Sequence, residues 1–335
     1  MTELRFVDVC AGAGGLALGL EQAGFEPVLL LDKKAVACGT LRLNRPAWQV
    51  IETDLLDFAP ALHQEVYDVD LLSAGLPRVK SSATVARTET EEELRLLEAT
   101  VYLAHAVQPR ALLIENVPEL ASAPSYEPIR DFIRKELDHL GYRFRWFVLN
   151  AAHYGVPQDR KQGVLVALKE PYFDAFRPPE RKVREHQSVG QALRQSMAMG
   201  GWQDVDRWAA QAVSVAPTLV GGSDRRGGAD LGPTGTRKAW ARMGVDGGTV
   251  ADDVPRPDFV WAPETGRQGM VRITTDQAAL LQGFPSEWKF VGKKTARYRQ
   301  IGHASPPPVS NALGLAIRSA LAKPGTPVAG YTSTP

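Results

Sequence analysis

The chain has few cysteines, no long apolar run and almost no net charge. Two cysteines in 335 residues exclude a disulfide framework and favour a reducing compartment. No stretch approaches about 18 consecutive apolar residues, so we expect no membrane-spanning helix, and the first residues lack the pattern of a signal peptide. Because the net charge is only +1, binding to nucleic acid would have to come from local basic patches.

Short apolar runs alternate with amphipathic segments over the first half of the chain. The runs typical of strands cover residues 4–9, 27–31, 49–52, 69–73, 111–114, 142–149 and 162–167. The segments with helical spacing cover residues 16–23, 35–43, 91–107 and 126–140. This alternation predicts an α/β fold with a doubly wound, mostly parallel sheet. Ligands of such sheets bind beyond the carboxyl ends of the strands.

The regular alternation weakens after residue 168. Residues 169–270 are punctuated by prolines, and 221–235 is dense in glycine, which predicts a second, smaller, irregular domain. Its tryptophans are expected in its core rather than against bases: Trp202, Trp208, Trp240 and Trp261. We therefore assign 1–168 and 271–322 to a large domain, with helices beginning near Thr274 and Val309, and 323–335 to a flexible tail.

Three features at successive predicted strand ends indicate a nucleoside-cofactor site. A glycine turn, Ala11–Gly15, follows the first strand and opens a helix, so a ligand can approach the helix N-terminus closely. Asp32 follows the second strand, where a carboxylate can bind both ribose hydroxyls. Asp54 follows the third strand and could accept a hydrogen bond from an adenine amino group. The turn fits either NAD or S-adenosylmethionine (SAM), and these residues alone do not separate the two.

Five blocks then resemble, in order, the motifs of the DNA (cytosine-5) methyltransferase family. They are Asp8–Leu16, Glu115–Val117, Tyr154–Arg160, Arg272–Pro285 and Tyr298–Val309. The resemblance runs from residue 4 to about residue 321 and leaves 169–270 without a match. That is where the family carries its target-recognition domain.

The resemblance implies a class I methyltransferase fold that binds SAM, with S-adenosylhomocysteine as its product, and double-stranded DNA. DNA would lie between the two domains, with the target base flipped out of the duplex, which chemistry on a base ring requires. The positions implied to bind the cofactor are Phe6, Ala11, Gly12, Gly14, Gly15, Asp32, Lys33, Asp54, Leu55, Leu76 and Asn311.

The chain departs from the family at the nucleophile. The family follows its Gly-x-Pro unit with a cysteine whose thiolate adds to cytosine C6, so that C5 can attack the methyl group. Here Gly75-Leu76-Pro77 is followed by Arg78, whose guanidinium stays protonated and is no nucleophile. Lys80 would need a strongly depressed pKa to substitute. Cys10 and Cys38 lie in other segments.

The base pocket implied by the family changes at a second point. The family usually has Gln-x-Arg-x-Arg, whose second arginine helps to hold the cytosine, and Gln162 stands there in this chain. Glu115 and Arg160 remain at their family positions, and Glu115 would contact N3 and the amino edge of the base. The candidate catalytic positions are therefore Glu115, Arg160, Gln162 and, at the nucleophile position, Arg78. Lys33, Gln277 and His303 are further departures.

Six basic residues and one serine are candidates for contact with the DNA backbone. They lie in the loop after the Gly-x-Pro unit, in the glycine-dense segment and just after it: Lys80, Ser82, Arg87, Arg225, Arg226, Arg237 and Lys238. No Cys/His cluster has zinc spacing, so we predict no metal. The expected location is the cytoplasm, associated with the nucleoid. A partner protein subunit stays possible.

Two functions remain open at this point, and two further interpretations are disfavoured or rejected. The protein could bind SAM and DNA without methylating C5, as a regulatory subunit of a modification or defence system. It could instead methylate an exocyclic amino nitrogen, which needs no covalent adduct, with Gln162 and Glu115 as acceptors, although an Asp-Pro-Pro-Tyr motif is absent. A small-molecule methyltransferase is disfavoured because its substrate would not need the insert at 169–270. A single engineered substitution is rejected because Val79–Ser82 also differ from the family.

Overall fold

The computed structural model describes residues 3–79, 87–222 and 228–322. Its centre is a seven-stranded sheet with the order β3-β2-β1-β4-β5-β8-β6. The strands are β1 (Leu4–Val9), β2 (Phe25–Asp32), β3 (Val50–Glu52), β4 (Leu71–Gly75), β5 (Ala111–Asn116), β6 (Tyr142–Asn150) and β8 (Lys161–Lys169). Every neighbouring pair from β3 to β5 is parallel, and β8 runs antiparallel to both β5 and β6. The predicted doubly wound, mostly parallel sheet is confirmed.

The register brings the carboxyl ends of the central strands to one edge of the sheet. Val9 pairs with Ala74, and Gly75 pairs with Glu115. All six residues of β5 are buried, as expected for a strand covered on both faces. Polar residues that directly follow these strands therefore meet at the same edge.

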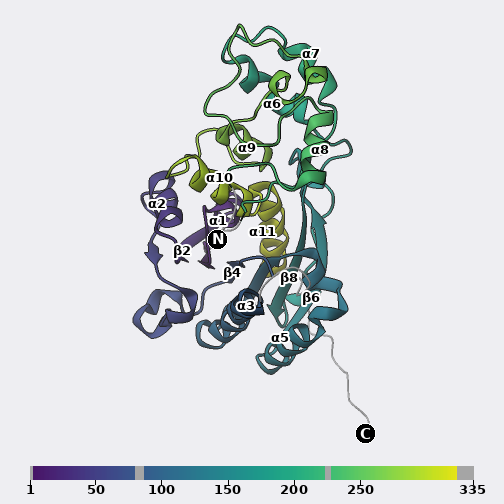
Figure 1. The fold of residues 1–335 in the computed structure, drawn as a ribbon. Coiled ribbons are helices and arrows are strands. Elements are labelled where there is room, and N and C mark those ends of the chain that lie inside the picture. The colour runs from purple at the N-terminus through teal and green to yellow at the C-terminus, as the bar shows by residue number, and fades with distance from the viewer. Residues whose placement is uncertain (1–2, 80–86, 223–227, 323–335) are drawn as a thin grey trace.

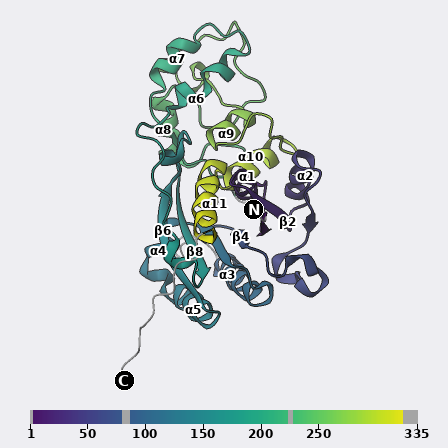
Figure 2. The same cartoon turned by 180° about the vertical axis from the view of Figure 1, so that it is seen from behind.

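Helices cover both faces of the sheet, over two separate apolar cores. On one face α1 (Gly15–Gln22) packs along α11 (Pro307–Leu321), although the two helices lie almost 300 residues apart in the sequence. A Cβ at Gly19 would lie 2.5 Å from the Pro307 carbonyl oxygen, so glycine permits this close contact. The other face carries α3 (Arg87–Val107) and α5 (Glu127–His139). Figures 1 and 2 show α11 beside β8 and α1 from both sides.

Short helices gather at one end of the molecule, away from α3 and α5 (Figures 1 and 2). They are α6 (Val189–Ala198), α7 (Val205–Gln211) and α8 (Thr234–Arg242), with α9 (Thr275–Leu281) and α10 (Lys294–His303) between them and the sheet. The tryptophans of this region are each at most 2% exposed, as expected for core residues: Trp202, Trp208, Trp240 and Trp261. The sequence pattern did not predict α6, α7, α8 or α10.

The four-part domain division stays a prediction. One apolar core runs without a break from Leu16 on α1 to Trp208 on α7. The predicted tail at 323–335 lies outside the described residues. None of the described helices is long and apolar enough to cross a membrane.

Candidate cofactor and base-binding site

The glycine turn after β1 has an open side and a packed side. Gly12 has a φ of +54°, and a Cβ there would have no heavy atom within 4 Å. Gly14 has a φ of +86°, and a Cβ there would lie 2.6 Å from Leu41. At Gly15 a Cβ would lie 2.0 Å from the carbonyl oxygen of Ser305. The positive φ angles favour glycine, and the open space over Gly12 is where a ligand could approach the turn.

Asp32 holds this turn in place. One carboxylate oxygen, Oδ2, accepts a hydrogen bond from the backbone N–H of Gly12 at 2.8 Å, and Oδ1 accepts one from Lys34 at 2.8 Å. Burial raises the pKa of Asp32, and the two backbone hydrogen bonds oppose that rise. The side chain thus connects the end of β2 to the glycine turn.

Asp54 lies at the same edge, after β3. Its Oδ1 accepts a hydrogen bond from Leu56 N at 3.1 Å, and its Oδ2 lies 3.3 Å from Lys33 Nζ. Lys33 Nζ also donates to Glu92 at 2.7 Å, and its hydrogen bond to Glu92 is the main cause that raises the pKa of Lys33. The structure therefore brings Asp32, Lys33 and Asp54 together beside the turn.

The other predicted cofactor residues differ in where they lie. Leu55 and Leu76 are buried in the apolar cluster that reaches this edge, and Ala11 belongs to the turn itself. Phe6 lies inside β1 and is fully buried in the opposite core. Asn311 lies on α11 next to Gly19, and its Oδ1 accepts a hydrogen bond from Lys182 Nζ at 3.2 Å. Neither Phe6 nor Asn311 follows a strand end.

Asn116 clamps the loop that follows β4. Its side-chain oxygen accepts a hydrogen bond from Val79 N at 3.0 Å, and its side-chain nitrogen donates to the Pro77 carbonyl at 3.1 Å. These two bonds hold the backbone on either side of Arg78. Among the described residues, none accepts a hydrogen bond from the Arg78 side chain. Arg78 is close enough to Arg160 for the two charges to repel, which contributes to a lowered pKa of Arg160.

Glu115 and Arg160 are buried side chains at this edge of the sheet, and both Arg78 and Glu115 are close enough to Arg160 to act on its charge. The hydroxyl of Ser305 donates a hydrogen bond to Glu115. Arg160 is fully buried, and its Nη1 donates to the carbonyl oxygens of Leu219 and Gly302 at 3.0 Å each. Burial first, and then Arg78, lower the pKa of Arg160 to about 9, while Glu115 opposes this. Arg160 still carries its charge at neutral pH.

Three buried polar atoms in this region have no hydrogen-bond partner among the described residues. They are Nε and Nη2 of Arg160 and Oε1 of Gln162. Gln162 lies on β8, two residues from Val164, which pairs with Glu115, so Gln162 and Glu115 share one face of the sheet. Because buried polar groups normally have partners, two donors and one acceptor are left for a ligand.

Segments from the second half of the chain pack against Gln158 and Arg160. Gln158 accepts a hydrogen bond from Leu219 N at 2.9 Å and donates to Gln282 at 2.7 Å. His303 Nε2 donates to the Gly222 carbonyl at 3.0 Å. Desolvation and nearby cations, Lys34 first among them, lower the pKa of His303 to about 4, so the ring is neutral at pH 7.

The predicted DNA-contacting residues are only partly described. Arg237 lies on α8, and its Nε donates to the Gly232 carbonyl at 2.7 Å, while the neighbouring Lys238 is exposed. Arg87 begins α3. Four of the predicted contacts lie outside the described residues: Lys80, Ser82, Arg225 and Arg226. In the part of the chain that the structure describes, no group of three or more His, Cys, Asp or Glu side chains could hold a metal ion.

Sequence reasoning missed three sets of polar contacts. They are the Asn116 clamp, the Ser305 hydroxyl on Glu115, and an Asp246 carboxylate that binds Arg267 and Arg272. Asn116 follows the predicted catalytic Glu115 directly, which is the one signal in the sequence that could have found it. The other two depend on residues far apart in the chain.

A mostly parallel sheet with a glycine turn after β1 and carboxylates after β2 and β3 defines the class I fold of SAM-dependent methyltransferases. The chain belongs to the C-5 cytosine-specific DNA methylase family, whose family profile matches residues 4–319. Members of this family use SAM as the methyl donor. The open space above Gly12 and the carboxylates of Asp32 and Asp54 fit the adenosine part of that cofactor.

Curated relatives match nearly the whole chain. The Type II methyltransferase M.NaeI of Lentzea aerocolonigenes is 41% identical over 96% of this chain and 76% of its own length. The Type II methyltransferase M.NgoMIV of Neisseria gonorrhoeae is 39% identical over 95% of this chain and 98% of its own length. Both relatives are thus named Type II methyltransferases.

Solved structures share the fold at low sequence identity. A DNA modification methyltransferase encoded within an Escherichia coli prophage superposes with a TM-score of 0.64 at 18% identity, over 96% of this chain and 100% of that chain. The Schizosaccharomyces pombe Dnmt2 methyltransferase gives a TM-score of 0.61 at 17% identity, over 92% and 96% of the two chains.

Proposed function

We propose that this protein binds SAM at the glycine turn, binds double-stranded DNA, and takes a flipped base into the pocket of Glu115, Arg160 and Gln162 without ordinary C5 methylation. The observation that carries this proposal is Arg78. By the resemblance of Gly75-Leu76-Pro77 to the family's Gly-x-Pro unit, Arg78 would occupy the position of the family nucleophile. Asn116 holds its backbone from both sides.

C5 methylation requires a thiolate that this pocket lacks. Cytosine C5 becomes nucleophilic only after a nucleophile adds to C6. The chain has two cysteines. Cys10 lies in the glycine turn, where burial and the carboxylate of Asp32 raise the pKa of its thiol. Cys38 is buried on α2 (Ala35–Asn44), and its Sγ donates to the Asp32 carbonyl at 3.3 Å. Glu115 is not among the charged groups that act on either thiol.

The cofactor site keeps the groups that binding requires. Asp32 would accept hydrogen bonds from the ribose hydroxyls, and Asp54, with Lys33 beside it, would lie at the adenine. Ala11, Gly12 and the start of α1 would leave room for the rest of the molecule. When bound, SAM would supply the activated methyl group.

The unpartnered atoms of the pocket fit one edge of a base. The Arg160 donors, Nε and Nη2, suit a ring carbonyl or ring nitrogen. The carboxylate of Glu115 and the Gln162 oxygen suit an exocyclic amino group. A cytosine offers both kinds of group on one edge, and extruding it exposes them to these side chains.

A second candidate function is methyl transfer to an exocyclic amino nitrogen. One observation favours it: Gln162 Oε1 is a buried acceptor without a described partner, and it can orient an N–H bond. This chemistry needs no covalent adduct, so Arg78 does not oppose it.

If the protein transfers no methyl group, it would act as a recognition subunit of a modification or defence system. It would do so in the cytoplasm on nucleoid DNA, with or without a partner subunit.

The test combines binding with product analysis. The purified protein is incubated with methyl-labelled SAM and methylation-free genomic DNA, the DNA is digested, and labelled nucleosides are identified by mass spectrometry. A gel-shift assay with the same DNA and equilibrium dialysis with SAM measure binding. We expect both ligands to bind and no labelled 5-methylcytosine to form.

Each other result has a defined meaning. Labelled N4-methylcytosine or N6-methyladenine would establish the second candidate function. Labelled 5-methylcytosine would refute the interpretation of Arg78. A protein that binds neither SAM nor DNA would refute the proposal as a whole.

A further inference from the structure

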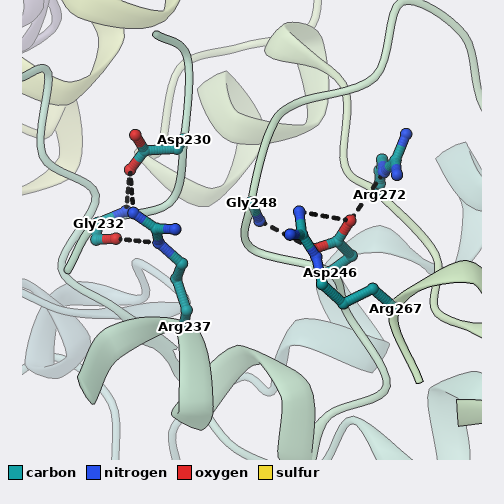
Figure 3. Close-up of polar contacts among 7 residues, drawn as sticks. All are labelled: Asp230, Gly232, Arg237, Asp246, Gly248, Arg267 and Arg272. Atoms are coloured by element: carbon teal, nitrogen blue, oxygen red, sulfur yellow. Dashed lines mark hydrogen bonds and ion pairs between the residues drawn. The ribbon is translucent and has the colours of Figure 1, made fainter. Parts of the chain in front are cut away.

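A buried carboxylate holds two exposed arginines in the second half of the chain (Figure 3). The Asp246 side chain is 2% exposed. It accepts hydrogen bonds from Arg267 Nε at 2.8 Å, from Arg272 Nε at 2.9 Å and from the backbone N–H of Gly248 at 2.9 Å. Burial raises its pKa, but the hydrogen bonds, that of Arg267 first, outweigh this and hold the pKa below its usual value. Asp246 is therefore ionised.

The two arginines keep their outer ends accessible. Their side chains are 66% and 47% exposed for Arg267 and Arg272. Arg267 uses one side of its guanidinium, Nε at 2.8 Å and Nη2 at 3.4 Å, to contact the carboxylate. This side-on contact fixes the plane of the guanidinium and directs its free end outward. Two cations on one carboxylate leave a net local charge of +1.

The turn beneath the arginines is shaped to receive them. A Cβ at Gly248 would lie 1.7 Å from Nη2 of Arg267, so only glycine leaves room for the guanidinium. A Cβ at Gly247 would lie 3.2 Å from Cγ of Arg237, whose Nη2 lies 3.9 Å from Asp230. Figure 3 shows this third arginine on the other side of the turn. A surface hollow of about 330 Å³ lies beside Arg267 and Arg272, so a ligand can reach them.

The turn at residues 246–248, against which the arginines pack, is called the arginine turn below. A short stretch of chain links it to the proposed base pocket. Gly222 receives the hydrogen bond of His303, and Leu231 N donates to the Gly247 carbonyl at 3.0 Å. Residues 222 and 230 are separated by eight peptide units, which span at most roughly 30 Å. Successive base pairs of a duplex lie about 3.4 Å apart, so this reach falls within the length of a short recognition site.

We propose that Arg267 recognises a guanine edge in the major groove, with Asp246 as the residue that positions its guanidinium. A guanidinium held in a fixed plane can donate two parallel hydrogen bonds to O6 and N7 of guanine, the commonest base-specific contact of arginine. A phosphate can also accept two hydrogen bonds from a guanidinium, so a preference for one base, which a phosphate contact does not give, is the result that identifies the guanine contact. The inference rests on the DNA binding proposed above and adds to it the residue that selects a base.

The experiment is a selection from a random DNA duplex library, with sequencing of the bound fraction. Wild-type protein, Arg267→Ala and Arg267→Lys are compared. Arg194→Ala is the matched control, because Arg194 is also an exposed arginine whose Nε contacts a carboxylate, here the exposed one of Asp206 at 2.6 Å. We expect wild type and Arg194→Ala to select the same DNA motif. Arg267→Ala should lose the preference for guanine at one position of that motif and keep the base preferences at the other positions.

Affinity for single duplexes then separates base from backbone contact. Arg267→Ala should bind the selected site about 5- to 150-fold more weakly than wild type. Replacing the relevant guanine with 7-deazaguanine, which lacks the N7 acceptor, should weaken wild type but not Arg267→Ala. Asp246→Asn should relax the same base position as Arg267→Ala, which a purely structural role would not do.

Two results would overturn the inference. If Arg267→Ala weakens binding equally for all sequences and lowers the salt slope by about one, the contact is to phosphate. If Arg267→Ala keeps both the motif and the affinity, Arg267 makes no contact with DNA. If wild type binds no DNA, the proposed function fails as well, so the two failures are distinguishable.

Discussion

Replacing Asn116 with alanine should release the loop that carries Arg78. Asn116 is the only described side chain that bonds this loop on both sides of position 78, through Val79 N at 3.0 Å and the Pro77 carbonyl at 3.1 Å. Without it the Val79 N–H is left buried and without a partner. The loop should therefore open more often, and position 78 should no longer be fixed at the pocket.

The size of the effect follows from the two bonds. A typical intramolecular hydrogen bond stabilises by about 0.5–1.5 kcal/mol, so two lost bonds correspond to about 1–3 kcal/mol. That raises the fraction of open loop by about 5- to 150-fold. Asn116→Asp keeps the acceptor for Val79 N but loses the donor to Pro77, so one bond remains. Its effect should be about 2- to 13-fold.

Hydrogen exchange read by mass spectrometry measures this opening at the Val79 amide. Asn116→Ala should exchange there fastest, Asn116→Asp at an intermediate rate and wild type most slowly. Amides of α11, such as that of Leu313, serve as an internal control and should not change. An unchanged Val79 rate in Asn116→Ala would refute the reasoning, because the loop would then be held by other contacts.

Three further predictions concern the cofactor turn, the sheet and the arginine turn. Asp32→Asn should bind SAM about tenfold more weakly in calorimetry, because a charge-assisted acceptor is lost; equal affinity would contradict this role. Burial raises the pKa of Asp8 from 3.8 to about 7. Between these two pH values the folded state keeps a proton on Asp8 that the unfolded state has released. The folded state therefore loses stability as the pH rises towards 7. In urea unfolding, the free energy of unfolding of wild type should fall between about pH 5 and about pH 8 by about 3 kcal/mol more than that of Asp8→Asn. Parallel pH profiles of the two proteins would contradict this prediction. Gly248→Ala should displace Arg267 and give the same relaxed motif as Arg267→Ala, whereas Gly235→Ala, with no heavy atom within 4 Å of its Cβ, should keep the wild-type motif.

The sheet and its functional edge could be predicted because local patterns determine them. The apolar runs at Leu4–Val9 and Ala111–Asn116 are strands, and the glycine turn follows the first of them. The direction of a strand has no such local signal. β8 is apolar like its neighbours, yet it runs antiparallel, because the hairpin after β6 returns the chain between β5 and β6.

Four helices of the second half, α6, α7, α8 and α10, were missed, and α10 shows one reason. In α10, apolar side chains are few, and packing of Tyr298 and Ile301 against the rest of the fold stabilises it. The contacts of Asp246 with Arg267 and Arg272 span 21 and 26 residues. Such contacts depend on how loops fold back in three dimensions, and residue spacing does not report that.

The most direct test of the central claim is covalent trapping on duplex DNA that carries 5-fluorocytosine. A nucleophile that adds to C6 of this base stays attached after methyl transfer, because fluorine at C5 cannot leave as a proton does. With SAM present, wild type should give no adduct on denaturing gels, and Arg78→Cys should give one, since Asn116 already holds position 78 at the pocket. An adduct with wild type would contradict the account, and so would an Arg78→Cys variant that binds the same DNA but forms none.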